Sequence, residues 1–283
     1  MKTEPGAQRP ENTGGQSGTL RDNTPDGSLH VHGLRHSFGD LEVLAGIDLD
    51  VPAGGSLGIV GPSGCGKSTL LEICAGLVDV QTGTVAAGGR TRTAGRLRAA
   101  ALMPQRDLLF PWLDALDNAT LAMRNRGVPR DQARETARPL FERFGLAGFE
   151  NAKPAELSGG MRQRVAFLRT LLADKPLLLL DEPFASLDTF SRAAMQEWLA
   201  TTLETAATGD TPRTTILVTH DVEEALYLCD RVVVLSGRPT VIVAELESPG
   251  ARRHPRTETV TSAAFASARQ RALTALQGAF QGA

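Results

Sequence analysis

Alternation of apolar and polar residues marks the start of the folded chain at Leu29. Residues 29–34, 41–44 and 47–51 alternate with the period of two that is typical of half-buried strands. All three segments precede the first glycine-rich loop of the chain. The pattern predicts an antiparallel β subdomain at this end of the folded region.

Short apolar segments follow, and predicted helices separate the later ones. Residues 189–207 and 221–229 are predicted helices, and alternation of helices with buried strands is typical of a parallel sheet. The sequence therefore predicts an α/β fold with a parallel sheet as its core. The strands predicted after residue 51, whichever sheet they join, are residues 56–60, 82–87, 100–103, 177–181, 214–219 and 232–236.

A region of helix-forming residues, at about residues 106–173, interrupts the strands. Residues 114–126 and 129–144 are predicted helices, and Pro129 lies near the first turn of the second. Ser158 is a predicted N-cap of a third helix, whose apolar positions recur at helical spacing. The sequence thus predicts a helical subdomain inserted into the α/β core.

The two ends of the chain differ in composition from this core. Residues 1–28 are rich in Gly, Pro, Thr and charge, so we expect a disordered tail and no signal peptide. Residues 247–283 are expected to form a linker and a short helix over residues 262–277, with Gly278 as its stop. The linker is either solvated chain or a contact to an anionic membrane leaflet, because it carries the basic residues Arg252, Arg253, His254 and Arg256.

Charge, cysteine content and the length of the apolar runs limit the classes of protein to which this chain can belong. The chain has 283 residues with 30 basic and 32 acidic side chains, a net charge of −2, which gives no general attraction to nucleic acid. Only three cysteines occur, which does not indicate a disulfide framework and favours a reducing compartment. No apolar run approaches the ~18 residues of a membrane span. We therefore expect a cytoplasmic protein with no membrane segment of its own.

A phosphate-binding loop follows the strand predicted at residues 56–60. It fits the pattern G-x-x-x-x-G-K-[ST], in which glycines let the backbone curl around phosphates, Lys67 neutralises them and the Ser68 hydroxyl ligates Mg²⁺. A helix is predicted directly behind it, which is the context that this motif needs. The loop predicts nucleotide binding through Gly61, Pro62, Ser63, Gly64, Cys65, Gly66, Lys67, Ser68 and Thr69.

Two adjacent carboxylates end the apolar strand predicted at residues 177–181. Ligands of parallel sheets bind at the carboxyl ends of the strands, so Asp181 and Glu182 are placed to face a bound nucleotide. The aspartate is a candidate magnesium ligand, and the glutamate is a candidate general base toward water. Such pairs are often only solvated loop starts, but the phosphate-binding loop favours the catalytic interpretation.

Ser158, Gly159 and Gly160 form a second candidate phosphate-binding surface. A serine N-cap followed by two glycines leaves backbone N–H groups free at a helix start, and the helix dipole favours an anion there. One chain therefore carries two phosphate-binding ends that lie far apart in the sequence.

With these motifs, residues 29–246 closely resemble an ATP-binding cassette (ABC) ATPase. Gln105 matches the glutamine loop of that family, residues 186–188 match the loop that touches the opposite subunit, and His220 matches the switch histidine. Phe38 occupies the place of the aromatic residue that stacks on adenine, although a core position is its alternative. The resemblance implies a P-loop NTPase with a RecA-like core, an antiparallel β subdomain and a helical insertion.

The same resemblance implies a working ATPase that uses ATP and Mg²⁺. Ser68, Gln105 and Asp181 would hold the metal, while Glu182 and His220 would be catalytic. Two copies of the chain would clamp two ATP molecules, each between the phosphate-binding loop of one copy and Ser158, Gly159 and Gly160 of the other.

Within the family, the chain resembles a stand-alone importer subunit. It has one cassette, no long heptad insertion and no fused membrane segment, and residues 108–118 resemble the nitrate, sulfonate and taurine importer branch. Phe110 and Trp112 in this segment suit an apolar patch where a membrane permease docks, the alternative being simple packing of the loop.

The partners implied are a second copy of the chain, a permease and, indirectly, a solute-binding protein, with no nucleic acid. This assigns the chain to the cytoplasmic face of the membrane as a peripheral subunit. Two other functions stay open on the sequence alone. One is a soluble, non-transport ABC ATPase that acts on a macromolecule, and the other is a nucleotide-binding scaffold without turnover.

Overall fold

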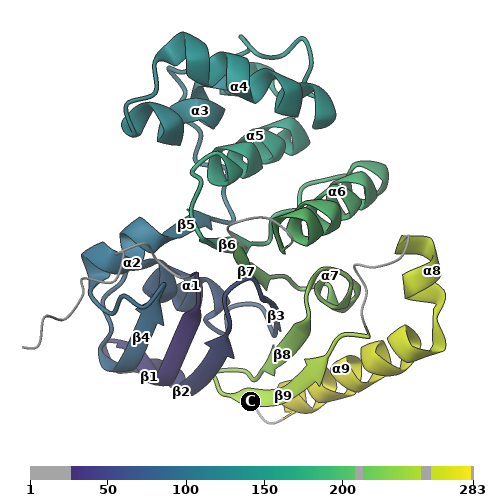
Figure 1. Ribbon diagram of the computed structural model, residues 1–283. Coiled ribbons are helices and arrows are strands. Elements are labelled where there is room, and N and C mark those ends of the chain that lie inside the picture. Colours follow the sequence, from purple (N-terminus) through teal and green to yellow (C-terminus); the bar gives the residue numbers. More distant parts are fainter. Residues whose placement is uncertain (1–26, 208–212, 250–255, 282–283) are drawn as a thin grey trace, which may run out of the picture.

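The computed structural model describes residues 27–207, 213–249 and 256–281 (Figure 1). Most of the predicted tail, and Arg252, Arg253 and His254 of the basic run, lie outside these residues. Ser28, which was assigned to the tail, is buried, and its carbonyl oxygen accepts a hydrogen bond of 2.7 Å from the amide of Gly88. The folded region therefore starts slightly before Leu29.

An antiparallel sheet contains the first two strands of the chain, as the alternating pattern predicts. Its strand order is β2-β1-β4, and in its register Leu29 of β1 pairs with Val51 of β2 and with Ala87 of β4. The two alternating segments at residues 41–51 are one continuous strand. The strands are β1 (Leu29–Phe38), β2 (Leu41–Val51) and β4 (Thr82–Ala87).

The core is a six-stranded sheet with the order β5-β6-β7-β3-β8-β9. The first five strands are parallel, as predicted, but β9 runs antiparallel to β8 at the edge. The sheet is therefore mixed: the predicted parallel core is confirmed, and β9 adds an antiparallel edge strand that was not among the predicted elements. The strands are β3 (Ser56–Val60), β5 (Ala100–Met103), β6 (Leu177–Asp181), β7 (Thr214–Val218), β8 (Arg231–Leu235) and β9 (Ile242–Glu247).

Among the described residues, four helices outside the helical subdomain alternate with the strands from β3 to β8. The helix behind the phosphate-binding loop ends at a left-handed Gly76, which is a common C-terminal cap. One short helix, α2, has no counterpart among the predicted elements. The helices are α1 (Lys67–Ala75), α2 (Thr93–Ala99), α6 (Thr189–Ala207) and α7 (Val222–Leu228).

The inserted helices group together at the top of the molecule, away from the antiparallel sheet (Figure 1). The Asp114 carboxylate caps the first of them by accepting from the Asp117 amide at 2.7 Å. Burial alone would raise the pKa of Asp117, but hydrogen bonds from Arg130 and Arg134 lower it and tie two helices together. These elements are α3 (Ala115–Asn125), α4 (Arg130–Arg143), the 3₁₀ turn Pro154–Glu156 and α5 (Gly159–Leu171).

Two helices, α8 (Arg256–Thr261) and α9 (Ala263–Gln281), end the described chain. The predicted stop at Gly278 is wrong, because α9 continues through it. Ala279 lies on the buried stripe of this helix with Phe265, Ala268 and Ala272. This burial offsets the cost of about 1 kcal/mol for a glycine within a helix.

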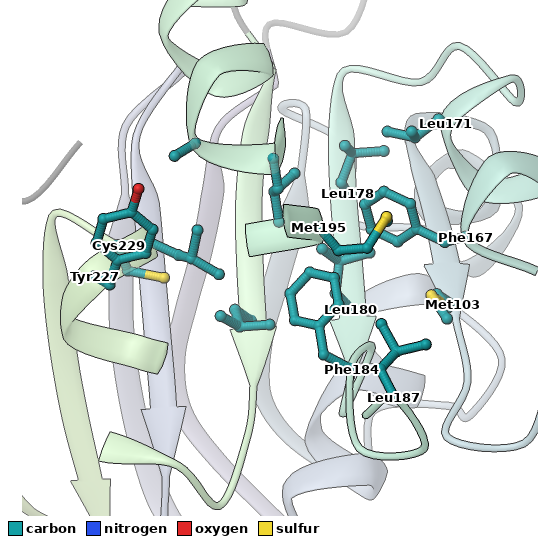
Figure 2. Close-up of a cluster of buried hydrophobic side chains, with 14 of the residues drawn as sticks. Met103, Phe167, Leu171, Leu178, Leu180, Phe184, Leu187, Met195, Tyr227 and Cys229 are labelled. Carbon is teal, nitrogen blue, oxygen red and sulfur yellow. The ribbon is translucent and has the colours of Figure 1, made fainter. Parts of the chain in front are cut away.

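Aromatic packing joins the helical subdomain to the sheet. The rings of Phe167 in α5 and Phe184, just after β6, have centroids 5.9 Å apart. Figure 2 shows them with Leu178 and Leu180 of β6 and with Met195 of α6. Helices α5 and α6 therefore both pack against the end of β6. In the part of the chain that the structure describes, no helix is long and apolar enough to cross a membrane.

Candidate functional site

The phosphate-binding loop joins the end of β3 to the start of α1, as the motif requires. Gly66 has a φ of 117°, and a Cβ atom there would lie 2.6 Å from the Cγ1 of Val43, so only glycine fits. The buried Lys67 ammonium donates to the carbonyl oxygens of Gly61 at 2.9 Å and Pro62 at 2.8 Å. The loop therefore curls around its own lysine, with the cation at its centre.

Cys65 has a structural place within this loop. Its side chain is buried, and burial raises the pKa of the thiol, so it stays neutral near pH 7. Its carbonyl oxygen accepts from the hydroxyl of Thr240, which fastens the loop to the segment between β8 and β9.

Asp181 and Ser68 lie together at the carboxyl end of β6. Burial raises the pKa of Asp181, while a hydrogen bond from the Ser68 hydroxyl and the nearby Lys67 charge oppose that rise. A carboxylate and a hydroxyl are oxygen donors of the kind that Mg²⁺ prefers. A divalent cation would also offset the cost of burying the Asp181 charge, so the pair fits the predicted metal.

Glu182 follows in a left-handed backbone conformation with a φ of 49°, which is uncommon for a residue with a side chain. Its amide donates to the Val218 carbonyl at 2.8 Å, which fixes this conformation from β7. Strained backbone of this kind is concentrated at functional sites.

The side chains of Gln105 and His220 meet the Glu182 carboxylate. Gln105 Nε2 donates to Glu182 Oε2 at 3.2 Å, and His220 Nδ1 lies 3.5 Å from the same oxygen. These residues follow β5, β6 and β7, which are neighbours in the sheet. Three separate motifs of the sequence therefore converge on one carboxylate.

Sequence reasoning missed Gln163, one turn into α5. Its Nε2 donates to the backbone carbonyl of Glu182 at 3.4 Å, so it supports the strained residue from the helical subdomain. In the sequence it stands between Arg162 and Arg164 and gives no signal, and only the structure shows it buried, where an amide needs a partner.

Ser158, Gly159 and Gly160 lie at the start of α5. The Ser158 hydroxyl accepts from the Met161 amide at 3.2 Å, as an N-cap does. Ser158 and Gly159 are exposed, whereas Gly160 packs close to Leu187. The helix start is therefore open toward solvent at Ser158 and Gly159.

Phe38 lies at the end of β1, beside the turn into β2, and its side chain is 54% exposed. Its ring and that of His36 form a T-shaped pair, with centroids 4.7 Å apart. The exposure rules out the core alternative and leaves the ring accessible for stacking.

Phe110 and Trp112 form an exposed aromatic pair in the helical subdomain, with ring centroids 5.0 Å apart. They line a hollow of about 580 Å³ together with residues of α3 and the following turn, including Leu121 and Val128. Trp112 is 69% exposed, which contradicts the alternative of simple loop packing for this residue. We name this surface the aromatic hollow.

Asn118 holds the loop that carries the aromatic pair. Its side chain accepts from the Phe110 amide at 2.7 Å and donates to the carbonyls of Phe110 and Leu113. Lys153 Nζ also donates to the Trp112 carbonyl at 2.9 Å. The backbone is fixed while the rings stay exposed.

Across the described residues, no group of three or more His, Cys, Asp or Glu side chains could hold a metal ion.

Comparison with known proteins agrees with this geometry. The ABC transporter family profile matches residues 44–185. The aliphatic sulfonates import ATP-binding protein SsuB 1 of Rhodococcus jostii is 46% identical over 227 residues, 80% of this chain and 86% of that protein. The taurine import ATP-binding protein TauB of Yersinia pestis is 38% identical over 218 residues, 77% of this chain and 83% of that protein.

A solved structure shows the same fold. It is described as the dimeric structure of a post-hydrolysis state of the ATP-binding cassette MJ0796 bound to ADP and Pi. The TM-score is 0.70 at 26% identity, over 78% of this chain and 99% of that one. Family profile, relatives and fold confirm the resemblance seen in the motifs: the chain belongs to the ABC transporter family, as one of its ATP-binding subunits.

Proposed function

We propose that this chain is the ATP-hydrolysing subunit of an importer for a small sulfonate-type solute, bound to a permease on the cytoplasmic face of the membrane. The convergence of Gln105 and His220 on the Glu182 carboxylate carries the hydrolytic part of the proposal. The 46% identity to a sulfonate import protein over most of both chains supports the solute class.

Lys67 and the loop around it would hold the phosphates of ATP. The Lys67 ammonium, which here donates to two loop carbonyls, would donate to a phosphate oxygen instead. Backbone N–H groups of the loop would donate to the same phosphate. Ser68, Asp181 and Gln105 would hold Mg²⁺, which supplies positive charge toward the phosphates. Phe38 would stack on adenine.

Glu182 would orient the attacking water and take its proton. Gln105 and His220 contact its carboxylate, and the hydrogen bond from its amide to the Val218 carbonyl fixes its backbone. The base is therefore positioned before the substrate arrives. Exclusion of bulk water would come from the second copy of the chain.

The second copy would contribute Ser158, Gly159 and Gly160 to each ATP. The exposed start of α5 offers free N–H groups and a helix dipole to an anion. The dimeric form of the structurally similar cassette supports this arrangement. Closure around ATP and reopening after hydrolysis would drive the permease between its two states.

An uptake assay tests the transport function directly. The chain is co-expressed with a candidate permease and solute-binding protein from the same genome, reconstituted in vesicles, and given ATP with taurine, an alkanesulfonate or nitrate. We expect ATP-dependent accumulation of the sulfonates. Co-purification with nucleic acid or ribosomes and no permease would instead support a soluble ATPase that acts on a macromolecule.

Replacement of Trp112 by alanine should uncouple hydrolysis from transport. The side chain lies on the aromatic hollow, and Asn118 and Lys153 of the helical subdomain hold its loop, so ATP affinity should change by less than about twofold. Uptake should fall by at least about tenfold, the typical loss at a buried aromatic anchor of an interface. The measurement is uptake and phosphate release in the same vesicles.

Phe149→Ala is the matched control for Trp112→Ala. Phe149 is also an exposed aromatic residue of the helical subdomain, but it does not line the aromatic hollow. It should leave uptake unchanged. Loss of ATP affinity in Trp112→Ala, with normal coupling per ATP, would show that the ring supports the fold of the subdomain instead.

A further inference from the structure

A buried polar network surrounds Glu224 in α7, four residues after His220. The side chain is 4% exposed, and Gln196 of α6, which is 1% exposed, donates from Nε2 to Glu224 Oε2 at 2.9 Å. A buried carboxylate is costly unless hydrogen bonds satisfy it, so these contacts hold one another in place. The motifs of the ATP site do not account for this network.

Hydrogen bonds link Glu224 to the residues on both sides of His220. Its carboxylate accepts a hydrogen bond from the Thr219 hydroxyl, and Thr219 is 2% exposed. The same hydroxyl oxygen accepts from the Asp221 amide at 3.1 Å. The Thr219 side chain therefore bridges the two residues that flank His220. The Asp221 carboxylate in turn caps α7 by accepting from the Glu223 and Glu224 amides.

The network also reaches the loop at residues 186–188. Arg192 of α6 lies near enough to Glu224 to lower the pKa of that carboxyl, opposing burial. The Arg192 Nη2 donates to the Leu187 carbonyl at 3.2 Å, and Leu187 packs against Gly160. Glu224 is therefore near both the histidine segment and the loop beneath the start of α5.

The C-terminal helices connect to this network through Arg256, the first residue of α8. Arg256 Nε donates to Gln196 Oε1 at 3.1 Å, so one amide bridges Arg256 and Glu224. The guanidinium also lies over the Tyr227 ring of α7, 5.8 Å from its centroid. Figure 1 shows α8 and α9 beside α7 on this side of the molecule.

We propose that Arg256, through Gln196 and Glu224, is a positioning residue for His220, so that the C-terminal helices set the rate of ATP hydrolysis. The path runs from Arg256 to Gln196, Glu224 and the Thr219 hydroxyl, and each step is a hydrogen bond on buried or half-buried groups. The inference rests on the proposed ATPase function, because it concerns the rate of that reaction.

Charges around Glu224 give the network a pH dependence that its test can use. Burial raises the pKa of Glu224 to about 7, against hydrogen bonds from Thr219 and Gln196 and the charge of Arg192. Asp221 adds to the rise, Arg256 faces the network from α8, and the ion pair of Glu223 with Arg269 lies outside it. Above pH 7 the carboxylate accepts two donors, and below it a proton competes with them.

Steady-state ATPase assays of the full chain test the proposal, at chain concentrations where the rate per chain no longer rises. Arg256→Ala should lower kcat by about fivefold to tenfold, as expected for one lost hydrogen bond, and leave KM for ATP within about twofold. Glu224→Gln should lower kcat at pH 8 but match wild type at pH 6, where the native carboxyl is also neutral. A purely structural defect would lower activity at both pH values.

The double variant separates a connected network from two independent defects. Arg256→Ala with Glu224→Gln should be no slower than the slower single variant, because both interrupt one path. Arg269→Ala is the matched control, since it removes an exposed ion pair between α9 and α7 without touching Gln196. It should keep the wild-type kcat.

Three outcomes overturn the inference. Wild-type kcat in Arg256→Ala, or a double variant whose losses multiply, contradicts the positioning role while leaving the ATPase function intact. An inactive wild-type chain overturns the ATPase function and this inference together. Melting temperatures of all variants within a few degrees of wild type exclude unfolding as the cause.

Discussion

Glu182→Gln is expected to slow ATP hydrolysis by roughly a hundredfold to ten-thousandfold, the usual contribution of a general base. The amide keeps the size of the carboxylate and can still contact Gln105 and His220, so the site should keep its shape. ATP affinity should stay within about threefold, because Lys67 and its loop are unchanged. Phosphate release and nucleotide titration measure the two effects.

The same variant should accumulate as an ATP-bound dimer. Closure needs ATP between two chains and reopening needs hydrolysis, so loss of the base should trap the closed state. Light scattering with ATP and magnesium should show twice the mass seen with ADP. Glu142→Gln makes the same chemical change at an exposed position of α4 and should behave as wild type. Normal turnover in Glu182→Gln would remove this residue from the role of base.

Gly159→Asp should abolish hydrolysis without disturbing the fold of its own chain. A Cβ at this position meets only the Arg162 Nη2 within 4 Å, at 3.9 Å, and a carboxylate in the first helical turn is favourable to the helix. A phosphate supplied by the second copy would instead meet a negative charge. Hydrolysis should fall by at least about a hundredfold, with an unchanged melting temperature.

Mixing the two inactive variants tests whether the site is shared. A dimer of one Glu182→Gln chain and one Gly159→Asp chain has one site with both defects and one with neither. With random pairing, an equimolar mixture should recover about a quarter of the wild-type rate. Gly159→Ala adds a Cβ atom without the charge and is the matched control. A mixture as inactive as its components would contradict a site built from two chains.

The elements that sequence predicted well are those whose signal is local. The phosphate-binding loop and the buried strands β6 and β7 are contiguous in sequence, and each carries its own composition and end signals. The candidate catalytic residues were found for the same reason, because each lies in a short motif. Only the structure could show that Gln105, Glu182 and His220 share one point in space.

The missed elements depend on distant contacts. Helix α2 has little apolar periodicity, and its buried anchor is Arg96, whose Nε donates to the Ile73 carbonyl at 3.2 Å. Strand β9 has few buried side chains and is defined by its pairing with β8. The predicted stop at Gly278 failed because burial of Ala279 against the core outweighs local propensity. The network at Glu224 has no sequence signal, since its members come from three helices and the segment before α7.

Asn118 gives the aromatic hollow an entropic advantage. A flexible loop that docks on a partner must lose conformational freedom at that moment, and the loss is subtracted from the affinity. Here the Asn118 side chain bonds Phe110 and Leu113 before any partner is present, so folding has already met that cost. The permease would then meet a rigid receptor that can transmit force. Affinity at this surface therefore depends on a residue that the partner need never touch.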